Sequence, residues 1–308
     1  MGHISLSQGV KITTFQPPEG FDPLSASQAD LAKFGFPSRP DDDAHHLARY
    51  RRVMGQLKGK FHYIQPTFRL NEDKLHKPRQ RRTTDPTETS SNWSGAVVNP
   101  PAGQSFRWVQ GDWVVPNVFA PTQNHWYYCA SWIGIDGDGS GDVCQAGVEC
   151  EVYQSGTSLI RNVYPWWEWY PAGEVQITNL GVVPGDMLTM LICTSQAAGS
   201  TTASVFITNR TSGASTSFAL TAPTGTKLVG NCAEWIVEAP TVGGSQSAIA
   251  DYGEVFFSVC EAVTNTGATV NGGSGDNINM TGSGGAVVSD GNLITPTVVQ
   301  CLYAGALP

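Results

Sequence analysis

Short apolar segments separated by Gly, Pro and Asn clusters fill the chain after Asn92, and they restrict it to a β-rich fold. Eleven of them have the length and the β-branched or aromatic content of strands. No convincing helix interrupts the series, which predicts an antiparallel sandwich. The segments are 93–98, 106–115, 127–135, 159–170, 174–177, 187–194, 203–208, 216–220, 232–238, 254–259 and 293–302, with 264–291 expected as loop or edge.

Charge divides the chain into two parts of opposite sign. Residues 1–83 hold 14 Lys or Arg and 8 Asp or Glu, which gives +6, and residues 84–308 hold 4 and 18, which gives −14. Helical spacing of apolar residues over 24–35 and 43–58 predicts two helices in the basic part. We therefore predict a basic, partly helical segment 1–83, a polar linker 84–91 and an all-β domain 92–308. Opposite charges favour contact between the two parts, although a basic tail without a partner in the chain is an alternative.

One predicted strand, residues 233–238, carries two carboxylates among apolar neighbours. Because strand side chains alternate between faces, Glu234, Ile236 and Glu238 share one face. Burying such carboxylates is costly unless they are paired or used. The residues alone leave two interpretations open, a functional site or an edge strand with a wet face.

The composition of the β domain excludes several chemistries. His125 is its one histidine, so a histidine-based zinc site is excluded and a Ser-His or Cys-His arrangement would depend on that residue. Phosphate-binding glycine loops and paired-aspartate motifs are absent, and the acidic charge argues against nucleic acid. The stretch 136–142 resembles a calcium loop, but Gly147 stands where the last ligand belongs, which favours a tight turn. We expect no metal and no cofactor.

Cysteine usage and the N-terminal sequence bear on the compartment. Seven Cys favour an oxidising environment with disulfide bonds and leave at least one thiol unpaired. A bridge between Cys144 and Cys232 is one option. No run of 18 apolar residues predicts a membrane helix, and residues 1–6 lack a signal-peptide pattern.

A series of motifs in fixed order resembles the glutamic peptidases of the eqolisin family. The motifs cover most of residues 90–260, and residues 21–37 resemble the leading segment of bacterial members. The matching stretches are 91–96, 113–116, 132–137, 145–147, 167–171, 233–238 and 251–253.

The resemblance implies a fold, a catalytic pair and a reaction. The fold is a concanavalin-like β-sandwich of two curved antiparallel sheets. The pair corresponds to Gln145 and Glu238, with Gln154 as an alternative for the glutamine. The reaction is acid-active endopeptidase cleavage of proteins and peptides by direct attack of water. The residues expected to line the substrate cleft are Trp93, Trp132, Asp136, Glu168 and Tyr170.

The resemblance also implies that residues 1–83 are an inhibitory prosegment, removed on activation of a zymogen. We expect a secreted, extracellular monomer with no membrane or nucleic-acid partner. Two rival functions remain at this stage. One is a β-sandwich glycoside hydrolase with Glu168 and Glu238 as its carboxylates. The other is a lectin-like carbohydrate-binding module.

Overall fold

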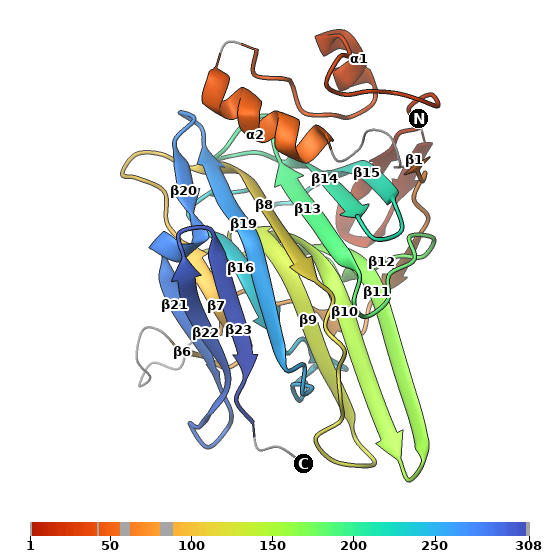
Figure 1. Cartoon of the computed structure of the whole chain (residues 1–308), viewed down its shortest axis with the longest axis vertical. Coiled ribbons are helices and arrows are strands. Elements are labelled where there is room, and N and C mark those ends of the chain that lie inside the picture. The colour runs from red at the N-terminus through yellow and green to blue at the C-terminus, as the bar shows by residue number, and fades with distance from the viewer. Residues whose placement is uncertain (1, 42, 56–61, 81–88, 306–308) are drawn as a thin grey trace.

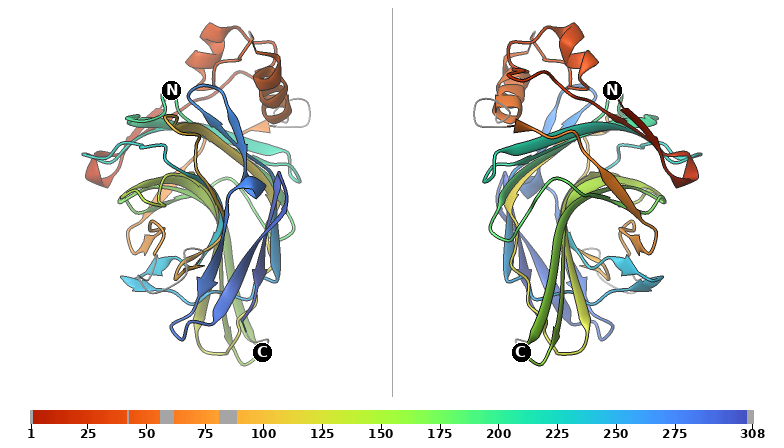
Figure 2. Two further views of the ribbon diagram at one scale, coloured as in Figure 1. Left: turned by 90° about the vertical axis from the view of Figure 1, so that its left-hand side faces the viewer. Right: turned by 90° about the vertical axis from the view of Figure 1, so that its right-hand side faces the viewer.

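The computed structural model describes residues 2–41, 43–55, 62–80 and 89–305 (Figure 1). Its strands form two large antiparallel sheets that curve in the same direction (Figure 2). This confirms the predicted all-β sandwich. The strands are β1 Gly2–Ser5, β2 Lys11–Thr14, β3 His62–Tyr63, β4 Phe68–Asn71, β5 Lys74–Leu75, β6 Thr89–Ser90, β7 Trp93–Val98, β8 Phe106–Val114, β9 Trp126–Ile135, β10 Val143–Ser155, β11 Ser158–Tyr170, β12 Glu174–Ile177, β13 Met187–Cys193, β14 Thr202–Asn209, β15 Ala214–Thr221, β16 Ala233–Glu238, β17 Thr241–Val242, β18 Ser245–Gln246, β19 Glu254–Thr264, β20 Thr269–Asn271, β21 Asp276–Thr281, β22 Val287–Thr295 and β23 Val298–Tyr303.

The first sheet, here called the β16 sheet, runs in the order β4, β12, β11, β10, β9, β16, β7, β21. The second, the β19 sheet, contains β2, β15, β14, β13, β8, β19, β23 and β22 in that order. Strand β21 also pairs with β22, so it joins the two sheets at one side. A small third sheet combines β5, β17 and β18.

Apolar side chains from facing strands fill the space between the two sheets. The largest are Trp113, Trp167, Trp169 and Trp235, all essentially without exposed surface. The alternating residues Ala233, Trp235 and Val237 of β16 point into this core. Glu234, Ile236 and Glu238 therefore point to the opposite face of the β16 sheet, as the alternation predicts.

Two helices lie on the outer face of the β19 sheet, α1 Gln28–Lys33 and α2 Ala44–Met54 (Figure 1). Ser27 caps α1 by accepting a hydrogen bond from the Asp30 backbone N–H. Both helices fall inside the predicted ranges 24–35 and 43–58, although residues 56–58 lie outside the described part. None of the described helices combines the length and apolar character required to cross a membrane.

Strand prediction fails in three places. Strand β10 was not predicted, although it is one of the two longest. The segment 293–302 contains the end of β22 and all but the last residue of β23, and the chain turns between them at residues 296–297. The basic segment supplies strands as well as helices, since β2 pairs with β15 and β4 pairs with β12. Residues 62–80 then run from β15 of the β19 sheet to the face of the β16 sheet that points away from the core, where they cover Glu168.

Candidate active site

Glu238 stands in the middle of the β16 sheet. Its strand lies between β7 and β9, so the wet-edge interpretation is wrong, and both Glu234 and Glu238 are fully buried. Trp132 Nε1 donates to Glu238 Oε2 at 2.9 Å, and Asn92 Nδ2 donates to Oε1 at 3.4 Å. Burial raises the pKa of Glu238 above its usual value, although hydrogen bonds from His76, Trp132 and Asn92 pull that pKa down.

Gln145 comes from β10 and is fully buried. It lies directly across from Gly134 of β9 and Glu168 of β11. Its Nε2 donates to the backbone carbonyl of His76 at 2.6 Å. Its Oε1 is buried and has no hydrogen-bond partner among the described residues. The amide thus holds one peptide carbonyl and keeps an acceptor available.

Gln154, the alternative glutamine, lies at the other end of the same strand. Nine residues of extended chain correspond to about 30 Å, and Gln154 pairs with Leu159 near the β10–β11 turn. The fold brings Gln145, and not Gln154, to the residues that surround Glu238.

Glu168 completes a row of polar groups on the same face. Both of its carboxylate oxygens accept the backbone N–H of His76, at 3.0 and 3.2 Å. Burial raises the pKa of Glu168 well above its usual value, and the nearby His76 lowers that pKa by less. A single residue of the basic segment, His76, therefore contacts Gln145, Glu168 and Glu238.

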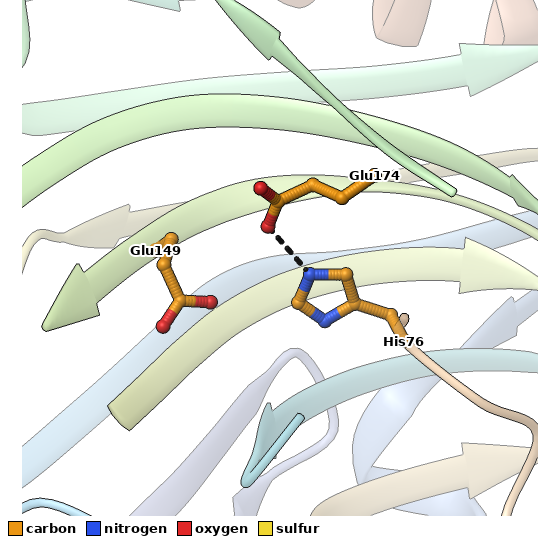
Figure 3. Close-up of side chains that lie close together, drawn as sticks. All are labelled: His76, Glu149 and Glu174. Atoms are coloured by element: carbon orange, nitrogen blue, oxygen red, sulfur yellow. Dashed lines mark hydrogen bonds and ion pairs between the residues drawn. The ribbon is translucent and has the colours of Figure 1, made fainter. Parts of the chain in front are cut away.

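The imidazole of His76 lies between two carboxylates. Its Nδ1 is 3.1 Å from Glu238 Oε2, and its Nε2 is 2.9 Å from Glu174 Oε2 (Figure 3). The ring stacks on Trp166 with 3.6 Å between ring centroids. Burial alone would lower the pKa of His76, but the hydrogen bonds that its ring donates to Glu174 and Glu238 outweigh burial and raise the pKa to about 10. The imidazole is therefore a buried cation at neutral pH.

One atom each of His76, Glu149 and Glu174 lie within 4.8 Å of one another, which is a spacing that a metal ion can use (Figure 3). A protonated imidazole has no lone pair left for a metal, because both nitrogens carry protons. The ammonium of Lys74 is also 3.8 Å from Glu149 Oε1. We therefore interpret this cluster as an ion-pair network.

Lys74 is almost fully buried two residues before His76. Its ammonium is 2.5 Å from Glu151 Oε1 and 2.8 Å from the Tyr164 hydroxyl. Burial opposes its charge, but Glu149, Glu174 and Glu151 raise the pKa of Lys74 above its usual value. With Arg79, whose Nη1 is 2.8 Å from Asp138 Oδ2, three cations of the basic segment meet carboxylates of the β domain.

The remaining predicted cleft residues divide into two groups. Trp132 holds Glu238, and Trp93 packs edge-on against Trp132 with ring centroids 4.9 Å apart. Tyr170 packs at the partly exposed margin of the same aromatic cluster. Gly147 makes room for Trp132, since a Cβ there would lie 2.4 Å from the Trp132 Cβ.

Asp136 has no contact of this kind with Glu238 and is held in a different place. It is buried in the turn after β9, where its two oxygens accept the backbone N–H groups of Val229 (2.6 Å) and Asn231 (3.0 Å). Its role in this structure is to hold residues 229–231 against the turn. In the turn 136–142, Asp136 therefore accepts backbone N–H groups and Asp138 pairs with Arg79.

The suggested bridge between Cys144 and Cys232 is not formed. All seven cysteines are free and buried. Cys232 Sγ accepts the backbone N–H of Asp138 at 3.3 Å, so it has a different partner.

Sequence reasoning missed the residues of the basic segment that enter the site, Lys74 and His76. It also missed the glutamates that meet them, Glu149, Glu151 and Glu174. The sequence contained one indication. Lys74 and His76 are separated by one apolar residue, and they lie in the basic segment that was predicted to contact the acidic domain. Glu149 and Glu151 alternate in β10, but that strand was not predicted.

The chain is similar in sequence to known proteins. Residues 91–303 match the model of the Peptidase A4 family. Aspergillopepsin-2 of Aspergillus niger is 33% identical over 271 residues, which are 82% of this chain and 88% of that protein.

Solved structures show the same fold. A scytalido-glutamic peptidase complex with a peptide-based transition state analog has a TM-score of 0.57 at 24% identity, over 70% of this chain and 98% of the other. Aspergilloglutamic peptidase of Aspergillus niger has a TM-score of 0.52 at 27% identity, over 58% of this chain and 99% of the other. The chain therefore belongs to the peptidase A4 family, the eqolisin glutamic peptidases, and is a peptide hydrolase with a β-sandwich fold.

Proposed function

We propose that this protein is an acid-active endopeptidase in which Gln145 and Glu238 form the catalytic pair. One observation carries the proposal. The backbone carbonyl of His76 accepts a hydrogen bond from Gln145 while the same residue contacts Glu238. A peptide thus already lies across both side chains, and the His76 carbonyl oxygen stands in for the carbonyl oxygen of a scissile bond.

The chemistry follows from these positions. Ionised Glu238 takes a proton from water as the water oxygen attacks the peptide carbonyl carbon. Gln145 Nε2 donates to the oxyanion that forms. Glu238 then gives its proton to the leaving nitrogen, the C–N bond breaks, and a carboxylic acid and an amine result. A raised pKa suits Glu238 to both proton transfers in mildly acidic solution.

Two neighbours assist the pair. Trp132 fixes the orientation of Glu238 through its indole N–H. Glu168 accepts the peptide N–H of His76 and would accept that of a substrate in the same place. Trp93 and Tyr170 supply apolar surface beside the pair.

Residues 74–80, here called the plug, make the unprocessed protein a zymogen. They fill the site with buried cations where substrate would bind. Acid weakens the plug because carboxylates that pair with these cations take up protons. Glu174 carries this effect, since Lys74 and His76 overcome its burial and lower its pKa below the usual value.

We place this activity outside the cell, because a peptidase that needs acid is inactive in a neutral cytoplasm. The acidic β domain acts on proteins and peptides as a monomer, without cofactor or nucleic acid.

Substitution of the two glutamines tests the proposal. Gln145→Ala should lower kcat on an unfolded protein by roughly 10²–10³-fold, the usual cost of one oxyanion donor. Gln154→Ala is the matched control on the same strand and should retain full activity. Glu238→Gln should lose nearly all activity. A normal kcat in Gln145→Ala or Glu238→Gln would overturn the catalytic assignment.

A further inference from the structure

The basic segment contacts the β domain in two chemically different ways. The plug, residues 74–80, meets carboxylates with three cations, and its strand pairing is limited to the two residues of β5 beside β17. Residues 2–71, here called the anchor, are attached by strand pairing and apolar packing. The two parts should therefore respond differently to acid.

The anchor contributes strands to both sheets. In β2, residues 12–14 pair with Leu220 to Phe218 of β15, and β3 pairs with the other end of β15. All four residues of β4 pair with β12 at the edge of the β16 sheet. These are neutral backbone hydrogen bonds, which do not change with pH.

Side chains of the anchor are also part of the hydrophobic core. Val10 and Ile12 are fully buried in the cluster between the sheets. Phe68 packs against Trp167 and Phe218, with ring centroids 6.3 and 5.1 Å away.

The helices add a second apolar contact on the opposite side of the β19 sheet. Leu31 and Met54 are fully buried there against Leu191 and Phe206. Phe36 and Phe206 pack with their rings tilted and their centroids 5.5 Å apart. Removing the helices would expose this apolar surface to water, which opposes their departure.

Few groups in the anchor contacts titrate in acid. Arg49 and Arg52 both pair with Glu261 of β19. Other charged or titratable groups in these contacts are Asp112, Arg107, Tyr50, Cys193, the His46–Asp43 pair, and Arg39, Asp41 and Asp22 around Tyr50. Loss of the ion pairs with Glu261 would remove one network and leave the strands and the apolar contacts intact.

We propose that the anchor stays bound to residues 92–308 after the chain is cut within residues 81–88, so that the activated protein is a non-covalent complex of two chains. The plug then remains tethered through Asn71 to a partner that does not leave. It withdraws in acid and returns to the site when the pH rises. Retention needs no enzymatic activity, whereas the return of the plug as an inhibitor rests on the proposed function.

The retention test avoids the protein's own activity. A Glu238→Gln chain receives the recognition sequence of a specific protease in place of residues 83–88. It is cut at pH 7.5 and passed over a gel-filtration column at pH 7 and at pH 4. We expect the N-terminal fragment and the β domain to elute together at both pH values, as identified by mass. Separate elution at pH 4 would overturn the proposal.

A second measurement tests the tether and uses the active chain with the same site. After cutting and gel filtration at pH 4, a step to pH 6.5 should suppress hydrolysis, and a step back should restore it. A matched chain with a second cleavage site in place of Glu72 and Asp73 releases the plug and keeps the anchor. That chain should stay active at pH 6.5 after gel filtration. Equal suppression in both chains, or in neither, would contradict the tethered inhibitor.

Discussion

The strongest prediction about inhibition concerns His76. Its imidazole is fully buried between Glu174 and Glu238, and its pKa is raised from 6.5 to about 10. A pKa of about 10 lies about three units above pH 7. At 1.36 kcal/mol per unit, the site at pH 7 prefers the imidazolium of His76 over the neutral imidazole by about 4 kcal/mol. Removing one partner of a buried ion pair costs about 3–5 kcal/mol, which is similar. Substitution of His76 by Ala should therefore weaken the binding of the plug to the site by roughly 10³-fold.

The assay uses a synthetic peptide of the plug, residues 74–80, as an inhibitor of the chain that was cut at both engineered sites and has therefore released its own plug. At pH 6, where free histidine is largely protonated, the peptide with His76→Ala should have a Ki about 10³ times higher than the natural peptide. Lys77→Ala is the matched control. It also removes one cation, but Lys77 forms no ion pair within the described residues, and its backbone carbonyl bond to Asn92 is kept.

The pH dependence of inhibition follows from the opposite pKa shifts of His76 and Glu174. The raised pKa of His76 makes its contribution complete below pH 6.5 and removes it as the pH rises towards 10. The lowered pKa of Glu174 makes its contribution complete above its usual value of 4.5 and removes it as the pH falls further. Inhibition should be strongest between about pH 5 and 6.5. A His76→Ala peptide within threefold of the natural one, or an equal loss with Lys77→Ala, would refute this reasoning.

Three further predictions concern single side chains. Trp132→Phe removes the indole donor to Glu238, so the acidic limb of the kcat–pH profile should move to higher pH and kcat should fall by roughly tenfold; an unchanged profile would show that the bond has no such role. Glu234→Gln concerns stability. Both oxygens of Glu234 are buried without partners among the described residues, and burial raises its pKa well above 4.5. Where the unfolded state has lost this proton and the native state still holds it, the group destabilises the protein increasingly as pH rises. Urea unfolding should show Glu234→Gln close to wild type at pH 4 and more stable at pH 7, and equal differences at both pH values would contradict this. Ile12→Ala should cost about 2–5 kcal/mol in the same assay if the anchor belongs to the core, whereas a loss below 1 kcal/mol would place it outside.

The sequence predicted the strand of Glu238 because its apolar residues alternate and stop at Pro240. It did not predict β10, which carries Gln145. One face of that strand contains Gln145, Gly147, Glu149 and Glu151. Contacts in the site explain these residue types, and strand propensity does not. Gly147 in particular is explained by its contact with Trp132, which comes from another strand.

The position of His76 could not be predicted either. Its partners come from β10, β11, the start of β12 and the end of β16, and they meet only after the β16 sheet has formed. The charge imbalance between residues 1–83 and 84–308 indicated attraction, but it did not identify which cations would be buried. Strand pairing by β2 and β4 was hidden for a similar reason, since these short segments are stabilised by their neighbours in the sheets.

The central claim is that Glu238 performs peptide hydrolysis in acid. The most direct test is hydrolysis of an unfolded protein between pH 2 and 7 by the full chain and by its Glu238→Gln variant. We expect activity that peaks in acid, appears together with a cut after the plug, and is absent from the variant. Proteolysis by the folded variant at the rate of the natural chain, or none by the natural chain after the cut, would contradict it.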